Sequence, residues 1–134
     1  MTVEIERITT EPDWYEPYRI ALGYRVGDLL VLSGQAAIDR EGNVVGAGDF
    51  DAQARQVFEN LAFVLEVGGS SLANVVKVTI YLTEMANFPK IVELRGRYFT
   101  PPYPADTIVE VNALALPDLM IEIEAIAVVD EARA

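Results

Sequence analysis

Residues 120–129 read Met-Ile-Glu-Ile-Glu-Ala-Ile-Ala-Val-Val, and this stretch decides the fold. Its side chains alternate with a period of two, which predicts a β-strand with two different faces. One face begins with Ile121 and Ile123 and is wholly apolar, so it predicts a covering layer of helices. The other face carries Glu122 and Glu124 between apolar neighbours and is too apolar to be left in water. We therefore expect this second face to lie in or beside a subunit interface.

The composition indicates one domain that associates with copies of itself. The chain has 134 residues, which we assign to a single domain, 1–134. Hydrophobic residues make up 51% of it and the mean hydropathy is +0.23, yet no apolar run reaches the ~18 to 20 residues of a membrane span. The first residues contain neither a basic segment nor an apolar segment of the kind found in signal peptides. We expect a cytoplasmic homo-oligomer without membrane contact.

The residue types that are absent exclude several kinds of chemistry. The sequence contains no cysteine and no histidine, so disulfides, thiolate nucleophiles, Ser-His-Asp triads and His or Cys metal sites cannot be built. The net charge is −11, from 21 acidic and 10 basic residues. Because phosphate binding depends on clustered Lys and Arg, this charge disfavours a nucleic acid as partner.

The chain in order predicts strands alternating irregularly with two helices. Asp49 or Asp51 can cap the first helix, which Gly68 ends, and the second begins near Asn87. The second helix is expected to bury Phe88, Ile91, Leu94 and Tyr98. Strands are predicted at residues 3–8, 20–26, 29–32, 75–82, 107–111 and 120–129. In the strand at 75–82, the apolar face is expected to contain Val76, Val78, Ile80 and Leu82. This order favours an α+β sheet with both helices on one face.

Carboxylates are the first candidates for chemistry. Glu122 and Glu124 point to one face of their strand, either as solvated rim groups or with one desolvated enough to hold a water for attack on an electrophilic carbon. If the last two long strands pair, Asp106 would lie on the same sheet near these glutamates, and two close carboxylates would form an acid and a base. The alternative is that Asp106 is a solvated residue at the start of a strand and has no chemical role.

A second group of candidates would bind rather than react. Ser33 and Gly34 end a strand and could offer a hydroxyl and backbone N–H groups to an oxyanion, although such residues often only form a turn. The aromatic ring of Tyr18 could equally line a pocket or lie in the core. Arg95 and Arg97 on the second helix are typical of a solvated face.

Several motifs carry a resemblance to a known family. They are Pro17-Tyr18, Ser33-Gly34-Gln35, the run DAQARQ at residues 51–56, VKVTIYL at 76–82, VEV at 109–111 and IEIEAIA at 121–127. In this order and spacing the chain, from about residue 17 to residue 129, resembles the RidA family, also called YjgF or endoribonuclease L-PSP. The resemblance implies a chorismate-mutase-like α+β fold and a homotrimer with three clefts, each between two neighbouring subunits.

The resemblance also implies an activity. Well-characterised members hydrolyse reactive imines and enamines to a 2-oxo acid and ammonia without a metal or cofactor. Carried over by position, Glu122 matches the glutamate that orients the hydrolytic water, Tyr18 a cleft aromatic, and Ser33 with Gly34 the strand-end groups that face the ligand. We accordingly expect no metal and no cofactor.

Two positions depart from the imine-deaminase subgroup. Asp106 stands where that subgroup has an arginine that grips the substrate carboxylate, and Ile108 stands where a cysteine is common. Two carboxylates in a confined cleft repel each other, so the chain resembles subgroups that lack this arginine. Two hypotheses follow: Arg95 supplies the missing cation, or Asp106 selects a cationic or amine-bearing ligand.

The expected function is a deaminase-type hydrolase acting on a small imine, enamine or related C–N metabolite, with Glu122 as the base. The alternative is a non-catalytic trimer that uses the same cleft to bind a small metabolite or a partner enzyme. A ribonuclease function, which the historical family name carries, is disfavoured by the charge of −11.

Overall fold

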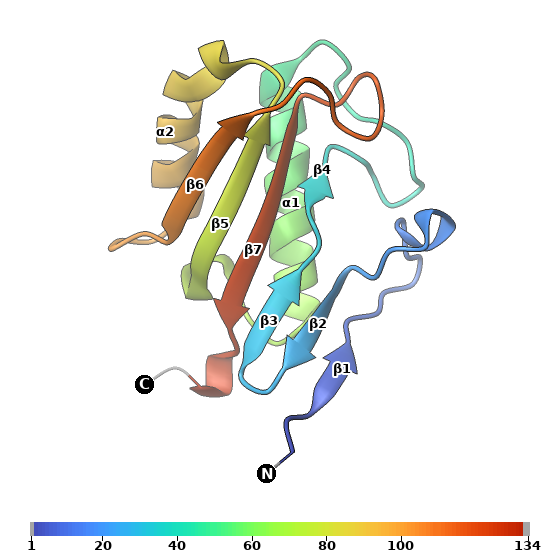
Figure 1. The fold of residues 1–134 in the computed structure, drawn as a ribbon, viewed down its shortest axis with the longest axis vertical. Coiled ribbons are helices and arrows are strands. Elements are labelled where there is room, and N and C mark those ends of the chain that lie inside the picture. Colours follow the sequence, from blue (N-terminus) through green and yellow to red (C-terminus); the bar gives the residue numbers. More distant parts are fainter. Residues whose placement is uncertain (1, 133–134) are drawn as a thin grey trace.

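The computed structural model describes residues 2–132 as one mixed sheet with two helices on it (Figure 1). The sheet order is β1-β2-β3-β7-β5-β6, and β4 pairs with β7. The helices are α1 (Phe50–Val67) and α2 (Phe88–Tyr98). The strands are β1 (Ile5–Arg7), β2 (Gly23–Val26), β3 (Leu29–Leu32), β4 (Gln35–Ala36), β5 (Val75–Leu82), β6 (Ala105–Glu110) and β7 (Ile121–Val128). The predicted α+β class is confirmed.

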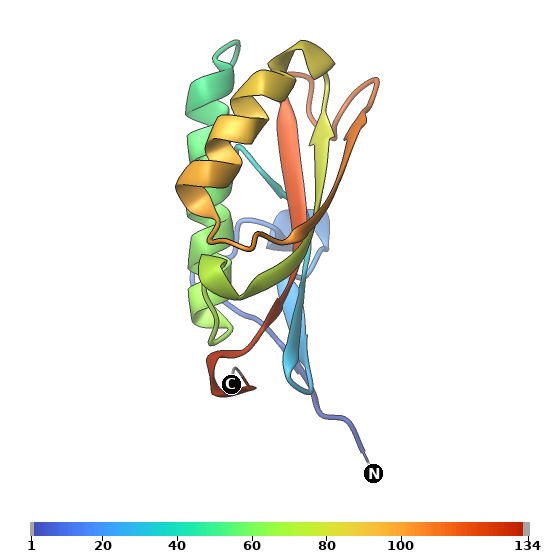
Figure 2. The ribbon, with the colours of Figure 1, turned by 90° about the vertical axis from the view of Figure 1, so that its left-hand side faces the viewer.

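Strand β7 is the centre of the sheet. It runs antiparallel to β3 and β4 on one side and to β5 on the other. Its residues alternate between buried and half-buried along the whole strand, and Ile121 and Ile123 are completely buried. Both helices lie against the face that these isoleucines form, as the side view shows (Figure 2). The two faces predicted from the alternation are therefore confirmed.

Helix α1 covers the middle of the sheet. Asp49 caps it, because its side chain accepts a hydrogen bond from the backbone N–H of Ala52 at 3.1 Å, and Gly68 follows its last turn. Its apolar stripe includes Phe58, Leu61 and Leu65, each no more than 1% exposed. Burial of this stripe, at roughly 1.5 to 3 kcal/mol for each large side chain, fixes the helix on the sheet.

Strands β5 and β6 form a parallel pair joined by α2, which places β5 between β6 and β7. The last two long strands do not pair with each other, so the interpretation that brought Asp106 beside Glu122 was wrong. Asp106 pairs with Val78, which is completely buried under the helices, whereas Glu122 pairs with Tyr81 on the open face. Residues that pair across neighbouring strands point to the same face of a sheet. Asp106 and Glu122 therefore lie on opposite faces.

Two details of the predicted packing were wrong. A β-bulge between Val75 and Lys77 turns Val76 outward, so that Val76 is 46% exposed and Val75 is buried in its place. Phe88 is 39% exposed, while Tyr98 stacks on Phe58 with ring centroids 4.2 Å apart.

The face of the sheet opposite the helices is open in a single chain (Figure 2). It carries exposed apolar side chains on β2, β3 and β6 and a polar centre around Glu122, Glu124 and Tyr81. The exposed apolar side chains are Tyr24, Leu29, Val31 and Val109. Within residues 2–132, no helix has the length and apolar character that crossing a membrane requires.

Candidate active site

A cavity of about 260 Å³ lies beside Glu122, where β3 ends and β4 begins. It brings together four of the residues predicted from the sequence: Tyr18, Ser33, Gly34 and Glu122. The remaining lining residues are Tyr15, Ile20, Ala36, Ile38, Ala115, Leu116 and Leu119. The cavity is thus mainly apolar and contains one acidic side chain.

Glu122 is held between two strands and packed against a glycine. On β7 it pairs with Ala36 of β4 and with Tyr81 of β5. A Cβ atom on residue 34 would lie 2.5 Å from Oε2 of Glu122 and 2.8 Å from its Cδ, closer than real side chains approach. Only glycine at position 34 therefore leaves room for the carboxylate where it lies.

The surroundings of Glu122 favour its protonated form. Burial raises the pKa of the Glu122 carboxyl group above its usual range, and the negative charge of Glu124 raises it further. Glu124 itself accepts a hydrogen bond from the hydroxyl of Tyr81, and this bond raises the pKa of Tyr81. The two glutamates thus have different roles in the structure, because only Glu122 lines the cavity.

Ser33 uses both of its hydrogen-bond donors inside the chain. Its backbone N–H donates to the carbonyl of Leu22 at 2.9 Å, and its hydroxyl donates to the carbonyl of Ala21 at 2.5 Å. The Ser33 hydroxyl can therefore offer the cavity an acceptor rather than a donor. Ser33 therefore does not supply the oxyanion donor that the sequence pattern allowed.

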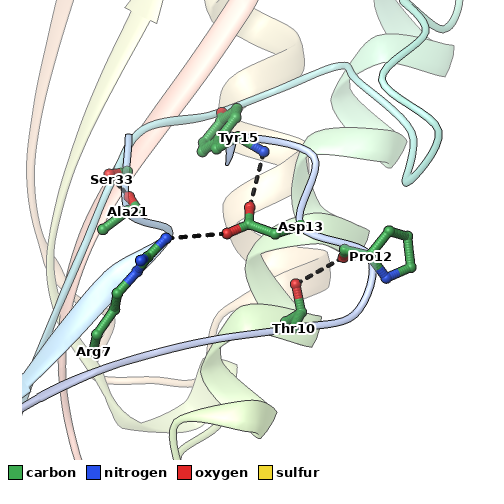
Figure 3. A network of polar contacts seen from close by, with 7 residues as sticks. All are labelled: Arg7, Thr10, Pro12, Asp13, Tyr15, Ala21 and Ser33. Atoms are coloured by element: carbon green, nitrogen blue, oxygen red, sulfur yellow. Dashed lines mark hydrogen bonds and ion pairs between the residues drawn. The ribbon is translucent and has the colours of Figure 1, made fainter. Parts of the chain in front are cut away.

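The segment before β2 places two tyrosines at the cavity. Asp13 fixes the segment, since its carboxylate accepts hydrogen bonds from Arg7 at 3.4 Å and from the backbone N–H of Tyr15 at 2.9 Å (Figure 3). The buried hydroxyl of Tyr15 donates to the carbonyl of Gly34, and burial and the charge of Glu122 raise the pKa of Tyr15. Tyr18 is 45% exposed and lies at the rim.

Two buried amides on α1 hold the walls of the cavity. The side chain of Asn60 donates to the carbonyls of Ala36 and Ile38, at 3.1 and 2.7 Å, and both of those residues line the cavity. On the opposite wall, Gln53 donates to the carbonyl of Asp118 at 2.7 Å and accepts from the N–H of Met120 at 2.8 Å. These bonds fix the connection that carries Leu116 and Leu119.

Sequence reasoning missed the roles of Gln53 and Asn60, although a signal was present. The two residues are seven apart and lie within the apolar stripe of an amphipathic helix, where a polar side chain needs a buried partner.

Arg95 and Asp106 lie apart from this cavity and bind each other. Nε and Nη2 of Arg95 each donate to one carboxylate oxygen of Asp106 at 2.9 Å, and the side chains are 25% and 16% exposed. Both residues line another cavity, between α2 and the start of β6. Ile108 is half-buried and packs against the core. In a single chain, four of the predicted site residues therefore line the Glu122 cavity, two line the other cavity, and Ile108 lines neither.

The described part of the chain offers no metal centre. Among residues 2–132, no three acidic side chains gather closely enough to hold a metal ion, and the sequence has no His or Cys. The polar side chains in the lining of the cavity are those of Glu122, Ser33, Tyr15 and Tyr18.

Comparison with known proteins identifies the family. A family model described as endoribonuclease L-PSP matches residues 8–129. The chain belongs to this family. Members of the endoribonuclease L-PSP family are also named RutC, RidA or YjgF proteins, so the resemblance seen in the sequence is confirmed.

Relatives of known sequence or structure cover most of the chain. A RutC family protein of Pyrococcus horikoshii is 43% identical over 111 residues, which are 83% of this chain and 86% of that protein. A Dermatophagoides farinae protein named 2-iminobutanoate/2-iminopropanoate deaminase is 33% identical over 114 residues, 85% of this chain and 87% of that protein. The crystal structure of RidA from the Antarctic bacterium Psychrobacter matches with a TM-score of 0.76 and 35% identity, covering 82% and 88% of the two chains.

Proposed function

We propose that the protein hydrolyses a small imine or enamine at the Glu122 cavity without a metal or cofactor. The observation that carries the proposal is a half-buried carboxylate with a raised pKa on the wall of an otherwise apolar cavity. A general base works best when its pKa lies close to the working pH, and a raised pKa brings a carboxylate closer to that condition. The family relative named as a 2-iminobutanoate/2-iminopropanoate deaminase supports this reaction class.

The reaction needs one base and one water. The substrate reacts as the protonated imine. The Glu122 carboxylate takes a proton from the water while the water oxygen bonds to the C=N carbon, and the C=N π electrons become the lone pair of the carbinolamine nitrogen. The protonated Glu122 then returns its proton to the nitrogen of the resulting carbinolamine. The C–N bond breaks with release of ammonia, while the carbinolamine hydroxyl loses its proton and becomes the new carbonyl group. Every proton is thereby exchanged with Glu122 or water.

We propose further that the working form is a homotrimer of a subgroup without the carboxylate-binding arginine. The open sheet face supports self-association, because it exposes Tyr24, Leu29 and Val31 beside a polar centre. A neighbouring subunit placed on this face would cover it and complete the cleft beside Glu122. The cytoplasm remains the predicted location.

Hydrolysis is tested by generating several imines enzymatically and following their disappearance with semicarbazide as a trap. We expect the protein to lower the yield of trapped imine, to raise the rate of ammonia release in proportion to its concentration, and to lose both effects in Glu122→Gln. Hydrolysis of every imine at the spontaneous rate would contradict the proposal.

The alternative, a non-catalytic trimer that binds a metabolite, is favoured by one observation. Both donors of Ser33 are used within the chain, so the cavity offers few groups to stabilise charge in a transition state. Ligand-induced thermal stabilisation together with spontaneous-rate hydrolysis of all imines would support the binder.

A further inference from the structure

Among the described residues of one chain, no positively charged side chain lines the cavity beside Glu122. Its eleven lining residues include Glu122 and no lysine or arginine. The apolar part of the lining is branched and aliphatic, from Ile20, Ile38, Leu116 and Leu119. An anionic ligand would therefore leave water beside a carboxylate and find no counter-charge in the lining that this subunit supplies, which is unfavourable.

The charge of Arg95, which could have compensated, is already balanced by Asp106, so the pair brings no net positive charge to a cleft even where a neighbouring subunit presents it. Arg95 forms two hydrogen bonds to Asp106, and the pair lies at a different cavity on the helix side of β6. On the open face, Lys77 donates to the hydroxyl of Thr107 at 2.7 Å. Arg19 follows Tyr18 in the sequence but lines an adjoining cavity with Arg7 and Glu16.

Two polar groups at the cavity, on Glu122 and Ser33, accept hydrogen bonds and therefore favour a ligand that donates them. The carboxylate of Glu122 accepts hydrogen bonds, and the Ser33 oxygen can accept one because its own hydrogen is directed to Ala21. An imine nitrogen that carries hydrogen, and more so its protonated form, meets this requirement. A substrate carboxylate only accepts hydrogen bonds, so neither of these two acceptors can bind it.

We infer that the substrate is an aliphatic imine that carries no carboxylate group. The inference rests on the proposed function and specifies its substrate class. An imine R–CH=NH then reacts with water to give an aldehyde R–CHO and ammonia, with the branched R group against Ile20, Ile38 and Leu116. The reaction that supplies such a substrate is the oxidation of a primary amine, rather than that of an amino acid.

Two imines that differ only in the carboxylate test the inference. An amine oxidase converts 3-methylbutylamine to 3-methylbutan-1-imine, and an amino-acid oxidase converts leucine to 2-imino-4-methylpentanoate. We expect the ratio of protein-catalysed to spontaneous hydrolysis to be about tenfold or more higher for the first imine, which corresponds to about 1.4 kcal/mol. An equal or higher ratio for the imino acid overturns the inference and leaves the proposed function standing.

A new charge at the rim provides a second test. Ala115 is exposed and lines the cavity, whereas Ala113 is exposed in the same connection and does not. We expect Ala115→Arg to shift the preference toward the imino acid by about fivefold or more, because it adds the missing cation. Ala113→Arg should leave the preference unchanged. A preference that is the same in both variants overturns the inference.

Binding of stable analogues separates failure of the inference from failure of the proposed function. If neither imine is hydrolysed faster than spontaneously, the proposed function fails, and 3-methylbutanamide and 3-methylbutanoate report on the cavity itself. A rise in Tm with the amide that exceeds the rise with the carboxylate supports a site without a cation. A rise with the carboxylate that equals or exceeds that with the amide, including no rise with either, overturns the inference.

Discussion

The side chain of Glu122 packs directly against Gly34 and occupies the space that a side chain at position 34 would need. A Cβ atom added to residue 34 would lie 2.5 Å from Oε2 of Glu122 and 2.9 Å from its Cγ. The neighbouring carbonyl group of Gly34 is itself held by the hydroxyl of Tyr15. Position 34 therefore sets where the carboxylate lies, without any polar contact between the two residues.

Gly34→Ala should displace the Glu122 side chain while the fold persists. Because catalysis depends on placing the base within about an ångström, we expect kcat/KM for imine hydrolysis to fall by about a hundredfold. Gly96→Ala is the control, since a Cβ there would meet nothing within 4 Å and helix α2 would gain about 0.5 to 1 kcal/mol. Equal activity of the two variants would show that the contact does not position Glu122.

The raised pKa of Glu122 predicts a pH-dependent cost to stability. Below the ordinary glutamate pKa of 4.5, the group is neutral in both the folded and the unfolded chain. As the pH rises, the unfolded chain ionises first, so stability falls until the pH has passed the raised pKa of the folded state. Glu122→Gln, which stays neutral, should have a higher free energy of unfolding than wild type at pH 7.

Urea unfolding of both proteins between pH 4 and pH 8 measures this cost. The difference should shrink toward the acid end of the range, where wild-type Glu122 is neutral as well. A Glu122→Gln protein that is less stable than wild type at pH 7 would refute the assignment of burial as the cause.

Gln53 should be more important for the cavity wall than its position on a helix suggests. In Gln53→Ala the carbonyl of Asp118 and the N–H of Met120 lose their partner, and a void forms, so we expect a loss of about 2 to 4 kcal/mol. KM should rise with it, because Leu116 and Leu119 are no longer fixed.

Gln56→Ala provides the matched control on the same helix. Gln56 is half-buried and makes one side-chain hydrogen bond, to Asn60, so the expected loss is below about 1 kcal/mol. Chemical denaturation and substrate titration of both variants give the comparison. Similar losses in the two variants would mean that the wall does not depend on Gln53.

The Arg95–Asp106 pair should contribute to stability and not to imine hydrolysis. A double-mutant cycle with Arg95→Ala and Asp106→Ala should give a coupling energy of about 1 kcal/mol, as expected for a partly exposed, bidentate pair. The coupling should decrease at high salt. Hydrolysis of a carboxylate-free imine should change little in either variant, and a loss comparable to that of Glu122→Gln would place the pair in the reaction.

The sequence predicted what depends on local periodicity. The alternation in residues 120–129 gave both faces of β7, and Asp49 and Gly68 gave the limits of α1, because these signals act within a few residues. The exposure of Val76 escaped prediction, since its bulge exists only through pairing with β7.

The relation between Asp106 and Glu122 depends on strand order, which local patterns do not contain. The β5–α2–β6 crossover inserts β5 between the two strands, and the resulting register places the two carboxylates on opposite faces. The roles of Gln53 and Asn60 were not predicted for a related reason. Their backbone partners are at least 22 residues away in the chain, so no local pattern identifies them.

The role of Glu122 as the base is tested most directly by comparing three proteins at equal concentration: wild type, Glu122→Gln and Glu124→Gln. The measurement is the rate at which each hydrolyses 3-methylbutan-1-imine. Glu124 is the matched control, because it shares the open face with Glu122 but lies outside the cavity and is bound to Tyr81. We expect hydrolysis by Glu122→Gln to fall to the spontaneous rate and Glu124→Gln to keep most of the wild-type rate. A Glu122→Gln protein as active as wild type would contradict the central claim that this carboxylate is the base.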